Sequence, residues 1–214
     1  MPVHEAAREG APEPAGAPAR EPARPLRRDA RRSRDAILAA VAALLAECGP
    51  AFTLTDAARE AGVATATAYR HFPSADDAIA AYYARLWTGL NASLDALPDR
   101  LDPVERIRDM CAEWAAQAAS WGPAAVYLRS PRGFLDRLDA ADPFVTALYG
   151  RLAAALRAAM TAGAIPAQDP RYAALIWVTL FDERVVVDLT HHQGLSPAQA
   201  AGRLTAALLA ALAA

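Results

Sequence analysis

The chain of 214 residues contains no lysine, and all 22 of its basic residues are arginine. It also lacks an apolar run of membrane-spanning length, and nothing near its start has the apolar core of a signal peptide. Its two cysteines, Cys48 and Cys111, are far apart in sequence and show no metal-ligand spacing. We therefore expect a cytoplasmic protein in which both thiols stay reduced and neither cysteine forms a disulfide.

The composition favours a helical globular protein. Apolar residues make up 54% of the chain and charged residues 21%. Alanine, leucine and arginine are abundant, while runs of β-branched residues are few. The longest strand-like run, Val185 to Val187, lies inside a longer apolar helix-like stretch. These features predict an all-α fold.

Charge is distributed unevenly. The net charge of −2 argues against a protein that coats nucleic acid along its whole surface. Between Arg24 and Arg34, however, six arginines stand against Asp29 alone. A patch of this kind on a mildly acidic protein suits local contact with phosphates. The alternative is a solvated charged flank.

Three regions follow from the pattern along the chain. Residues 1–26 are rich in proline, alanine and glutamate and lack helical periodicity, which predicts a disordered arm. From Ser33, apolar residues recur at three- and four-residue spacing until Gly49-Pro50, which should end the helix. We expect residues 27–73 to form one domain and residues 74–214 a second helical domain.

Two short helices joined by a glycine follow that first helix. Thr53-Leu54-Thr55-Asp56 is a capping box that should begin a helix ending near Ala61. Gly62 tolerates the left-handed backbone of a tight turn, and a second helix should run from about Thr65 to His71. Ala58 is small enough to let the helices cross closely. The layout predicts a helix-turn-helix, although an αα-hairpin within an ordinary bundle has the same spacing.

The second short helix is unusually rich in small and polar groups. The stretch GVATATAYRHFPS, residues 62–74, combines small side chains with hydroxyl, phenol, guanidinium and imidazole groups. Small side chains permit close approach to DNA, and the polar groups supply hydrogen bonds to phosphates and base edges. We therefore expect this helix to enter the major groove.

The string ILAAVAALLAECGPAFTLTDAAREAGVATATAYRHFPSADDAIAAY, from Ile37 to Tyr82, resembles the DNA-binding domain of the tetracycline-repressor (TetR/AcrR) family of bacterial transcriptional regulators. The resemblance implies an all-α protein, with an N-terminal three-helix helix-turn-helix domain and a C-terminal helical bundle for effector binding and dimerisation. It implies no cofactor, metal site or catalytic residue.

Position by position, the resemblance assigns DNA contacts to the helix before the turn and to the recognition helix. Together with the basic segment before the first helix, the predicted DNA-binding residues are Arg31, Arg32, Thr53, Thr55, Thr65, Ala66, Thr67, Tyr69, Arg70 and His71. Three positions depart from the family pattern. Ala64 replaces a capping serine, Ala68 a leucine, and Ala75 a lysine that often contacts phosphate.

In the family the C-terminal domain binds a small-molecule effector. The tryptophans all lie outside the DNA-binding segment, and most aromatic residues at helical spacing form core. A mostly apolar pocket with a few polar anchors nevertheless suits a small ligand. Candidate effector-binding residues are Trp114, Trp121, Tyr127, Arg129, Phe144, Trp177 and Asp182, with Glu183 and Arg184 as further anchors.

The last two helices are predicted at about Pro170–Thr190 and Pro197–Leu212. Each should begin at a side-chain cap followed by proline, as should the helices after Asp102 and Asp142. The family pairs these last helices across a two-fold axis, and Leu204, Leu208 and Leu212 form an apolar stripe. A homodimer would then read a near-palindromic double-stranded DNA operator. The alternative is an intramolecular two-helix core.

Two other functions compete with this interpretation. Asp182, Glu183, Asp188, His191 and His192 are metal-ligating residue types, which keeps a helical metal-dependent enzyme as the alternative. Their spacing matches no zinc motif or Glu-x-x-His pair, and no nucleophile motif or phosphate loop is visible. A DNA binder without sequence preference should be much more basic. We expect a regulator, acting as a repressor that its effector releases from DNA, and no enzyme.

Overall fold

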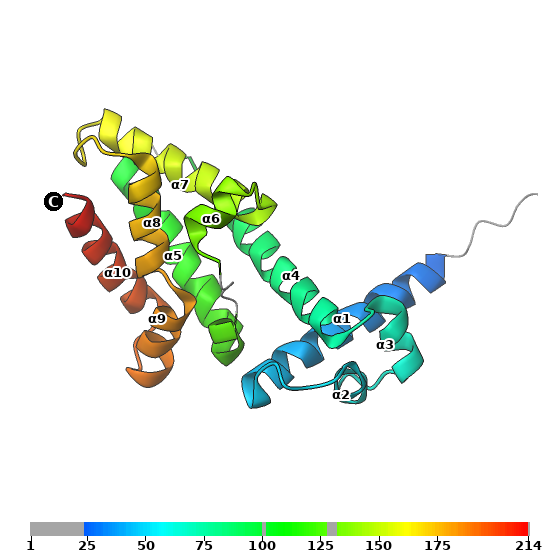
Figure 1. Ribbon diagram of the computed structural model, residues 1–214. Helices are drawn as coiled ribbons and strands as arrows, with labels where there is room; N and C mark the ends of the chain where they lie inside the picture. Colours follow the sequence, from blue (N-terminus) through cyan, green and yellow to red (C-terminus); the bar gives the residue numbers. More distant parts are fainter. Residues whose placement is uncertain (1–23, 100–101, 128–131, 214) are drawn as a thin grey trace, which may run out of the picture.

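The computed structural model describes residues 24–99, 102–127 and 132–213. Every regular element in these ranges is helical, which confirms the predicted all-α fold (Figure 1). The elements are α1 (Arg24–Cys48), α2 (Leu54–Glu60), α3 (Thr65–His71), α4 (Ala75–Asp95), α5 (Pro103–Trp121), the 3₁₀ helix η1 (Gly122–Tyr127), α6 (Phe134–Asp139), α7 (Pro143–Thr161), α8 (Pro170–Leu180), α9 (Glu183–Val187), the π-helix η2 (Asp188–His192) and α10 (Pro197–Leu212). No helix in these ranges has the length and hydropathy needed to cross a membrane.

Helix α1 is longer than the apolar pattern indicated. It begins at Arg24, nine residues before Ser33 and within the predicted arm, whose residues 1–23 lie outside the described ranges. Arginine and alanine are good helix formers, and Pro25 is tolerated because a first-turn N–H has no helical partner. The helix ends as predicted, at Cys48, where Gly49 takes a φ of 69°.

The helix-turn-helix forms at the predicted residues. The Thr53 hydroxyl accepts a hydrogen bond from the Asp56 backbone N–H at 3.1 Å, and the Thr53 backbone N–H donates to Asp56 Oδ2 at 2.9 Å. Gly62 has a φ of 64°, and the Val63 N–H donates to the Ala58 carbonyl at 3.0 Å. This bond fixes the turn between α2 and α3.

A small apolar core holds helices α1 to α4 together. Ala58 and Ala68 are both fully buried, so the small side chains do lie where helices meet. Phe72 is 2% exposed and seals the end of α3. The guanidinium of Arg34 lies over the Phe72 ring, 4.5 Å from its centroid. Side-chain packing and a cation–π contact therefore tie α3 to α1.

The C-terminal helices surround a second and larger core. Helix α5 packs against α4, α7, α9 and α10. The predicted caps all form: the side chains of Asp102, Asp142, Asp169 and Ser196 each accept backbone N–H bonds, with proline in the first helical turn. Trp114, Trp177 and Phe181 lie near its centre and are at most 1% exposed. Sequence caps thus set where these helices begin, and aromatic packing sets how they meet.

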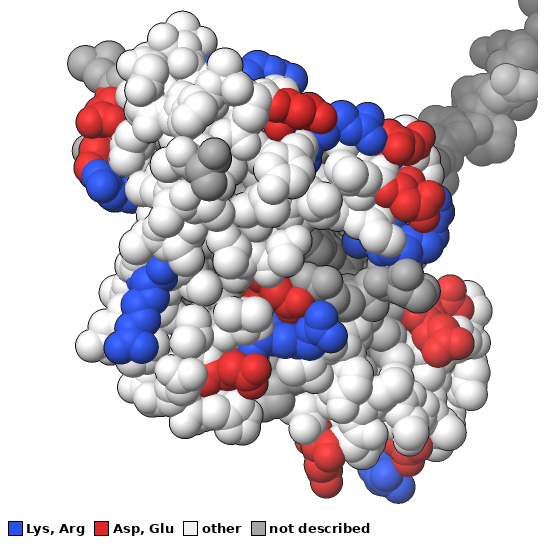
Figure 2. Space-filling view, turned by 60° about the vertical axis from the view of Figure 1, so that its left-hand side comes forward, with Lys and Arg blue, Asp and Glu red and all other residues white. Residues whose placement is uncertain are grey.

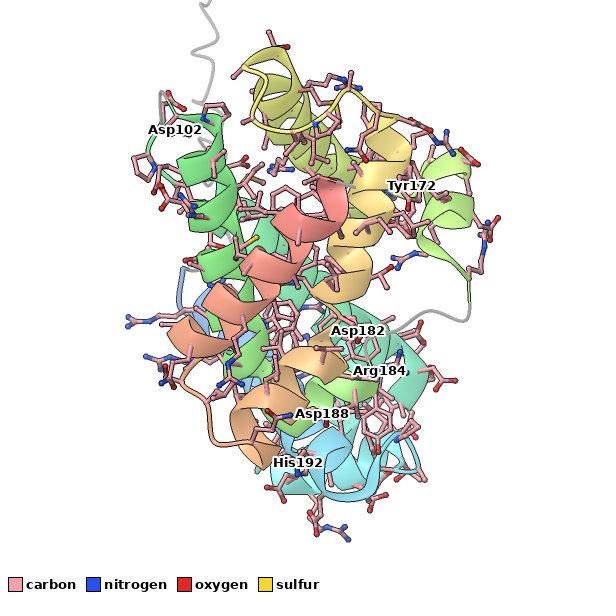
Figure 3. All side chains as sticks on the ribbon, turned by 90° about the vertical axis from the view of Figure 1, so that its left-hand side faces the viewer. Asp102, Tyr172, Asp182, Arg184, Asp188 and His192 are labelled. Atoms are coloured by element: carbon pink, nitrogen blue, oxygen red, sulfur yellow. The ribbon has the colours of Figure 1, made fainter. Side chains whose placement is uncertain are left out.

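The predicted single helix from Pro170 to Thr190 is wrong. Helix α8 ends at Leu180, and α9 starts at Glu183 before continuing as η2 (Figure 3). Asp182 causes the break, because it leaves the helical conformation with ψ near 131° and caps α9 by accepting the Arg184 N–H at 2.9 Å. The Asp182 carboxylate also accepts from Nη2 of Arg184 at 2.9 Å.

The leucine stripe of α10 faces the interior of its own chain. Leu204, Leu208 and Leu212 are at most 7% exposed and belong to the large core. They pack with α5, the principal neighbour of α10. The stripe is therefore intramolecular, and any dimer contact by α10 must use its opposite, exposed face.

Helix α4 joins the two cores. Tyr83 and Leu86 pack against both of them. Burial is the main cause that raises the pKa of Tyr83, to about 12, so its phenol stays protonated here. Farther along α4, Arg151 of α7 donates to Asn91 Oδ1 at 2.9 Å and pairs with Asp95. Helix α4 therefore connects the N-terminal and C-terminal halves (Figure 1), and η1 adds a second connection because it packs against α1 and places Ala124 in the N-terminal core.

Candidate DNA-binding surface and ligand pocket

Helix α3 presents a polar outer face. Thr65, Ala66, Tyr69 and Arg70 are exposed, with the Tyr69 side chain among the most exposed large rings at 53%. Thr67 is half-buried and its hydroxyl accepts from Nη2 of Arg70 at 3.1 Å. Ala68 and Phe72 anchor the opposite face in the core. Predicted DNA-contacting residues therefore share the outward side of one helix.

The threonines of α2 extend this surface. Thr55 is exposed in the first turn of α2, and Thr53 is exposed at its cap. The Thr53 hydroxyl and backbone N–H lower the pKa of Asp56, to which Arg59 also contributes. Asp56 therefore stays ionised and holds the capping box closed. The hydroxyl of Thr53 already donates to Asp56 Oδ2 at 2.7 Å, whereas the exposed Thr55 is not committed to the cap.

His71 ends α3 beside two arginines. Its ring is half-buried. Burial, and then the positive charges of Arg34 and Arg70, lower the pKa of His71 below its usual value. The imidazole is accordingly neutral near pH 7, and an approaching phosphate would favour its protonated form.

The arginine-rich segment is helical. The residues of α1 that precede Ile37, Arg24 to Ala36, extend about 20 Å beyond the start of the N-terminal core. Figure 1 shows this end of α1 projecting past α3. Arg28, Arg31 and Arg32 are exposed and spaced at three and four residues, so they share a face. The helix thus holds a row of positive charges at a fixed position relative to α3.

The three departures from the family pattern lie at different places in the fold. No side chain caps α3 at Ala64, as expected for alanine. Ala68 is fully buried in the N-terminal core. Ala75 is half-buried and begins α4, which Ser74 caps by accepting the Asp77 N–H at 3.1 Å.

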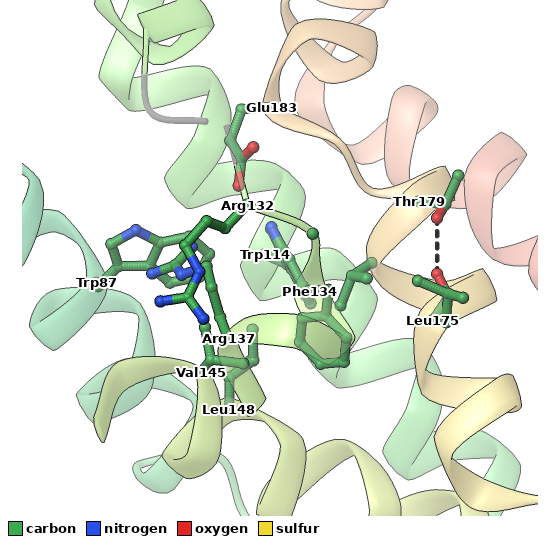
Figure 4. Close-up of a pocket in the computed structure, with 12 residues that line it drawn as sticks. Trp87, Trp114, Arg132, Phe134, Arg137, Val145, Leu148, Leu175, Thr179 and Glu183 are labelled. Carbon is green, nitrogen blue, oxygen red and sulfur yellow. Dashed lines mark hydrogen bonds between the residues drawn. The ribbon is translucent and has the colours of Figure 1, made fainter. Parts of the chain in front are cut away.

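A pocket of about 330 Å³ lies in the C-terminal half (Figure 4). Its wall combines aromatic rings, aliphatic side chains and three charged groups. The lining consists of Trp87, Trp114, Arg132, Gly133, Phe134, Arg137, Val145, Leu148, Leu175, Val178, Thr179 and Glu183. This size and composition are typical of a small-molecule site.

Both arginines of the lining are paired with aspartates. Arg132 donates to the two carboxylate oxygens of Asp136, at 2.6 Å from Nε and 3.1 Å from Nη2. Arg137 donates to Oδ2 of Asp142 at 3.2 and 3.1 Å. Glu183 is 5% exposed and takes part in a further interaction. The charges around the pocket are therefore largely balanced by the protein itself.

The predicted effector residues are scattered in the fold. Trp114 lines the pocket. Trp121 and Trp177 are buried in the large core, and Asp182 is the cap of α9. Tyr127 lines a different hollow between α1, η1 and η2, and Phe144 is half-buried outside the pocket lining. Arg129 lies outside the described residues.

Several lining residues were not assigned to the site from sequence. Trp87 and Phe134 were visible as aromatics, but helical spacing does not separate a pocket wall from core. Arg137 and Thr179 carry no local motif. Glu183, named from the sequence as a further anchor, does line the pocket, because the break after Leu180 starts α9 there.

The residues of the alternative enzyme do not converge. Within the described ranges, no group of three or more His, Cys, Asp or Glu side chains is placed to hold a metal ion. His192 lies 4.0 Å from Asp188 on the exposed π-helix, while Asp182 caps α9 and pairs with Arg184. Figure 3 shows Asp182 and Arg184 above Asp188 and His192 along these helices. This geometry offers no support for metal chemistry.

Comparisons with known proteins agree with this architecture. Residues 37–81 match the family described as bacterial regulatory proteins, tetR family. No curated protein matches the chain in sequence.

Solved structures of bacterial regulators share the fold. The fatty acid degradation regulator FadR from Bacillus halodurans superposes with a TM-score of 0.68 at 17% identity, covering 83% of this chain and 94% of that one. A tetR-family regulatory protein from Rhodococcus RHA1 gives 0.67 at 19% identity, covering 84% and 96%. FadR from Bacillus subtilis, in complex with stearoyl-CoA, gives 0.67 at 17% identity, covering 82% and 97%.

The family match lies on α1 to α4, the helices that carry the helix-turn-helix, and the shared fold extends over the C-terminal bundle. Residues 37–81 therefore carry the tetR-family domain, and the helical bundle that follows has the fold of the solved regulators.

Proposed function

We propose that this protein is a sequence-specific repressor that a small-molecule effector releases from a near-palindromic operator. The observation that carries the proposal is the outer face of α3, where Thr65, Tyr69 and Arg70 stand exposed on a helix anchored by Phe72. A helix presented in this way fits the major groove, where hydroxyl and guanidinium groups reach bases and phosphates.

The assigned contacts fall into two kinds. Base contacts are assigned to Thr55, Thr65, Ala66 and Thr67, in the leading turns of α2 and α3. Phosphate contacts are assigned to Thr53, Tyr69, Arg70, His71, Arg31 and Arg32. Phosphate contacts set affinity and register, while base contacts set the sequence that is read.

We propose that the protein acts as a homodimer through the outer faces of α8 and α10. Tyr172 of α8 is 55% exposed, and Gly202, Ala206 and Ala210 form an exposed row of small residues on α10. Figure 2 shows that the side of the molecule carrying these helices is largely uncharged, with its charged side chains scattered. Small residues allow close helix contact, and a two-fold dimer sets two α3 helices about one DNA turn apart.

The pocket is the proposed effector site. Trp87 reaches it from α4, the helix that also packs in the N-terminal core. Leu175 and Thr179 reach it from α8 and Glu183 from α9. A ligand that fits better when α4 has shifted would favour a dimer in which the spacing of the two α3 helices no longer matches the spacing of the half-sites. The release can be no stronger than the ligand's preference for that state.

Selection of bound fragments from genomic DNA tests the proposal. Purified full-length protein is incubated with fragmented DNA of its source genome at fixed moderate salt. We expect enrichment of one near-palindrome with half-sites about one turn apart. Replacing Thr65 and Thr67 with alanine should change or abolish that enrichment, whereas Thr146→Ala on the exposed surface of α7 should not. Uniform enrichment by the unaltered protein would contradict specific recognition.

His71 should make operator affinity depend on pH. Burial and the two neighbouring arginines lower its pKa in the free protein, while a DNA phosphate would raise it. Binding would then take up a proton, so affinity should increase as pH falls from 8 to 6, by at most about tenfold per unit for each histidine involved. Fluorescence anisotropy with the selected operator measures this. His71→Gln should show a flatter profile, and identical profiles would exclude the phosphate contact.

A further inference from the structure

One buried donor on the pocket wall is unsatisfied. Among the described residues, Nε1 of Trp114 and Nε1 of Trp177 are buried and have no hydrogen-bond partner. A buried N–H without an acceptor is unfavourable, because water satisfied it before folding. Of the two indoles, Trp114 alone lines the pocket. Figure 4 shows its nitrogen on the edge of the ring that is directed toward Arg132 and Glu183.

The charged groups of the lining favour a neutral ligand. Arg132 and Arg137 already donate to Asp136 and Asp142, so neither guanidinium is reserved for a ligand anion. Glu183 is likewise engaged in an interaction within the protein. A charged ligand of either sign would lose its hydration on entering the pocket without gaining a counter-charge in return. A molecule without net charge avoids this penalty.

The rest of the wall favours a compact apolar body. Trp87 and Phe134 offer aromatic faces, and Val145, Leu148 and Val178 offer aliphatic surface. The volume of about 330 Å³ lies near the lower end for small-molecule sites, so it suits a compact molecule rather than an extended chain with a large polar headgroup.

We propose that the effector is a neutral, compact, largely apolar carbonyl compound whose oxygen accepts a hydrogen bond from Nε1 of Trp114. The inference rests on the proposed function, since it names the chemical class that the proposed effector site takes. Side chains at the Trp114 end must move slightly to admit the oxygen, because the indole nitrogen is covered in the free protein.

Three probes with one ring skeleton test the proposal. Fluorenone has a carbonyl oxygen, fluorene lacks it, and fluorene-9-carboxylate carries a negative charge. Dissociation constants are measured by equilibrium dialysis with the full-length protein in the absence of DNA. We expect fluorenone to bind about five- to tenfold more tightly than fluorene, the value of one net hydrogen bond, and the carboxylate to bind most weakly.

The two tryptophans provide matched variants. Trp114→Phe should reduce the fluorenone-to-fluorene ratio to about one, since phenylalanine keeps an aromatic wall but has no N–H. Trp177→Phe removes the other unsatisfied N–H, which lies outside the pocket lining, and should leave the ratio unchanged. Thermal unfolding of each variant verifies that it is folded.

Several results would overturn the inference. They are equal binding of fluorenone and fluorene to the unaltered protein, tightest binding of the carboxylate, no binding of any probe, or a ratio that survives Trp114→Phe. The comparison within the unaltered protein remains decisive even if a variant does not fold. Because DNA is absent, failure here leaves operator recognition untouched, and failure of the operator selection leaves the probe comparison valid.

Discussion

Replacing Arg28, Arg31 and Arg32 together with glutamine should remove most of the salt dependence of operator binding. The three side chains are exposed on one face of α1, on the part that projects past α3. Arg28 shares the exposed face of Arg31 and Arg32, so we count it as a third phosphate contact. Each contact contributes about 0.9 to the log–log slope of affinity against salt, so six contacts in the proposed dimer contribute about five. Raising the salt concentration from 50 to 200 mM should therefore weaken operator binding by the triple variant about a thousandfold less than operator binding by the unaltered protein.

Glutamine keeps a good helix former, so α1 itself should persist. Arg157→Gln removes one exposed arginine from α7 and serves as the control, with the change in slope divided by the number of charges removed. Affinity is measured by anisotropy over a series of salt concentrations. An unchanged slope in the triple variant would show that these arginines are a solvated flank, the alternative that the sequence left open.

Replacing Phe72 with alanine should unfold the DNA-binding domain while the C-terminal bundle remains folded. Phe72 is 2% exposed, and its ring contacts the Arg34 guanidinium as well as the core. Removal of a buried phenylalanine ring costs about 3–5 kcal/mol of unfolding free energy, a large share of the stability of a small domain. Operator binding should be lost with the domain.

Tryptophan fluorescence reports on the C-terminal core and not on the DNA-binding domain. All four lie outside α1 to α3, and Trp114 and Trp177 sit in the large core. In the variant, circular dichroism should lose helix at low denaturant while tryptophan emission keeps the transition of the unaltered protein. Phe134→Ala, a half-buried ring of the C-terminal half, is the matched control and should affect emission instead. Coincident shifts of both signals in the Phe72 variant would show that the two cores unfold as one unit.

Local sequence signals predicted the N-terminal half well. The capping box at Thr53, the glycine turn at Gly62 and the bounds of α3 depend on residues within a few positions of one another, and the structure has them as predicted. The caps at Asp102, Asp142 and Asp169 are equally local. The early start of α1 was missed because a polar arginine-rich helix has no apolar periodicity to reveal it.

The C-terminal half was harder to predict because its features depend on contacts distant in sequence. The stripe of Leu204 and Leu208 has the same pattern whether it packs on α5 or on a second protomer, and the fold decides for α5. The pocket joins Trp87 of α4 to Phe134 and Glu183. Trp114 and Trp177 are indistinguishable in sequence and both lie in the large core, yet of the two only Trp114 lines the pocket.

The continuous course of α4 has a consequence for how this chain can vary. Trp87 at the pocket and Ile79 in the N-terminal core lie on one uninterrupted helix. Inserting a single residue between them would turn one end by about 100° relative to the other and lengthen the helix by about 1.5 Å. The number of residues between Ile79 and Trp87 is therefore constrained, even where the side chains between them are free to change. Lengths that differ by a whole number of turns are the tolerated alternatives.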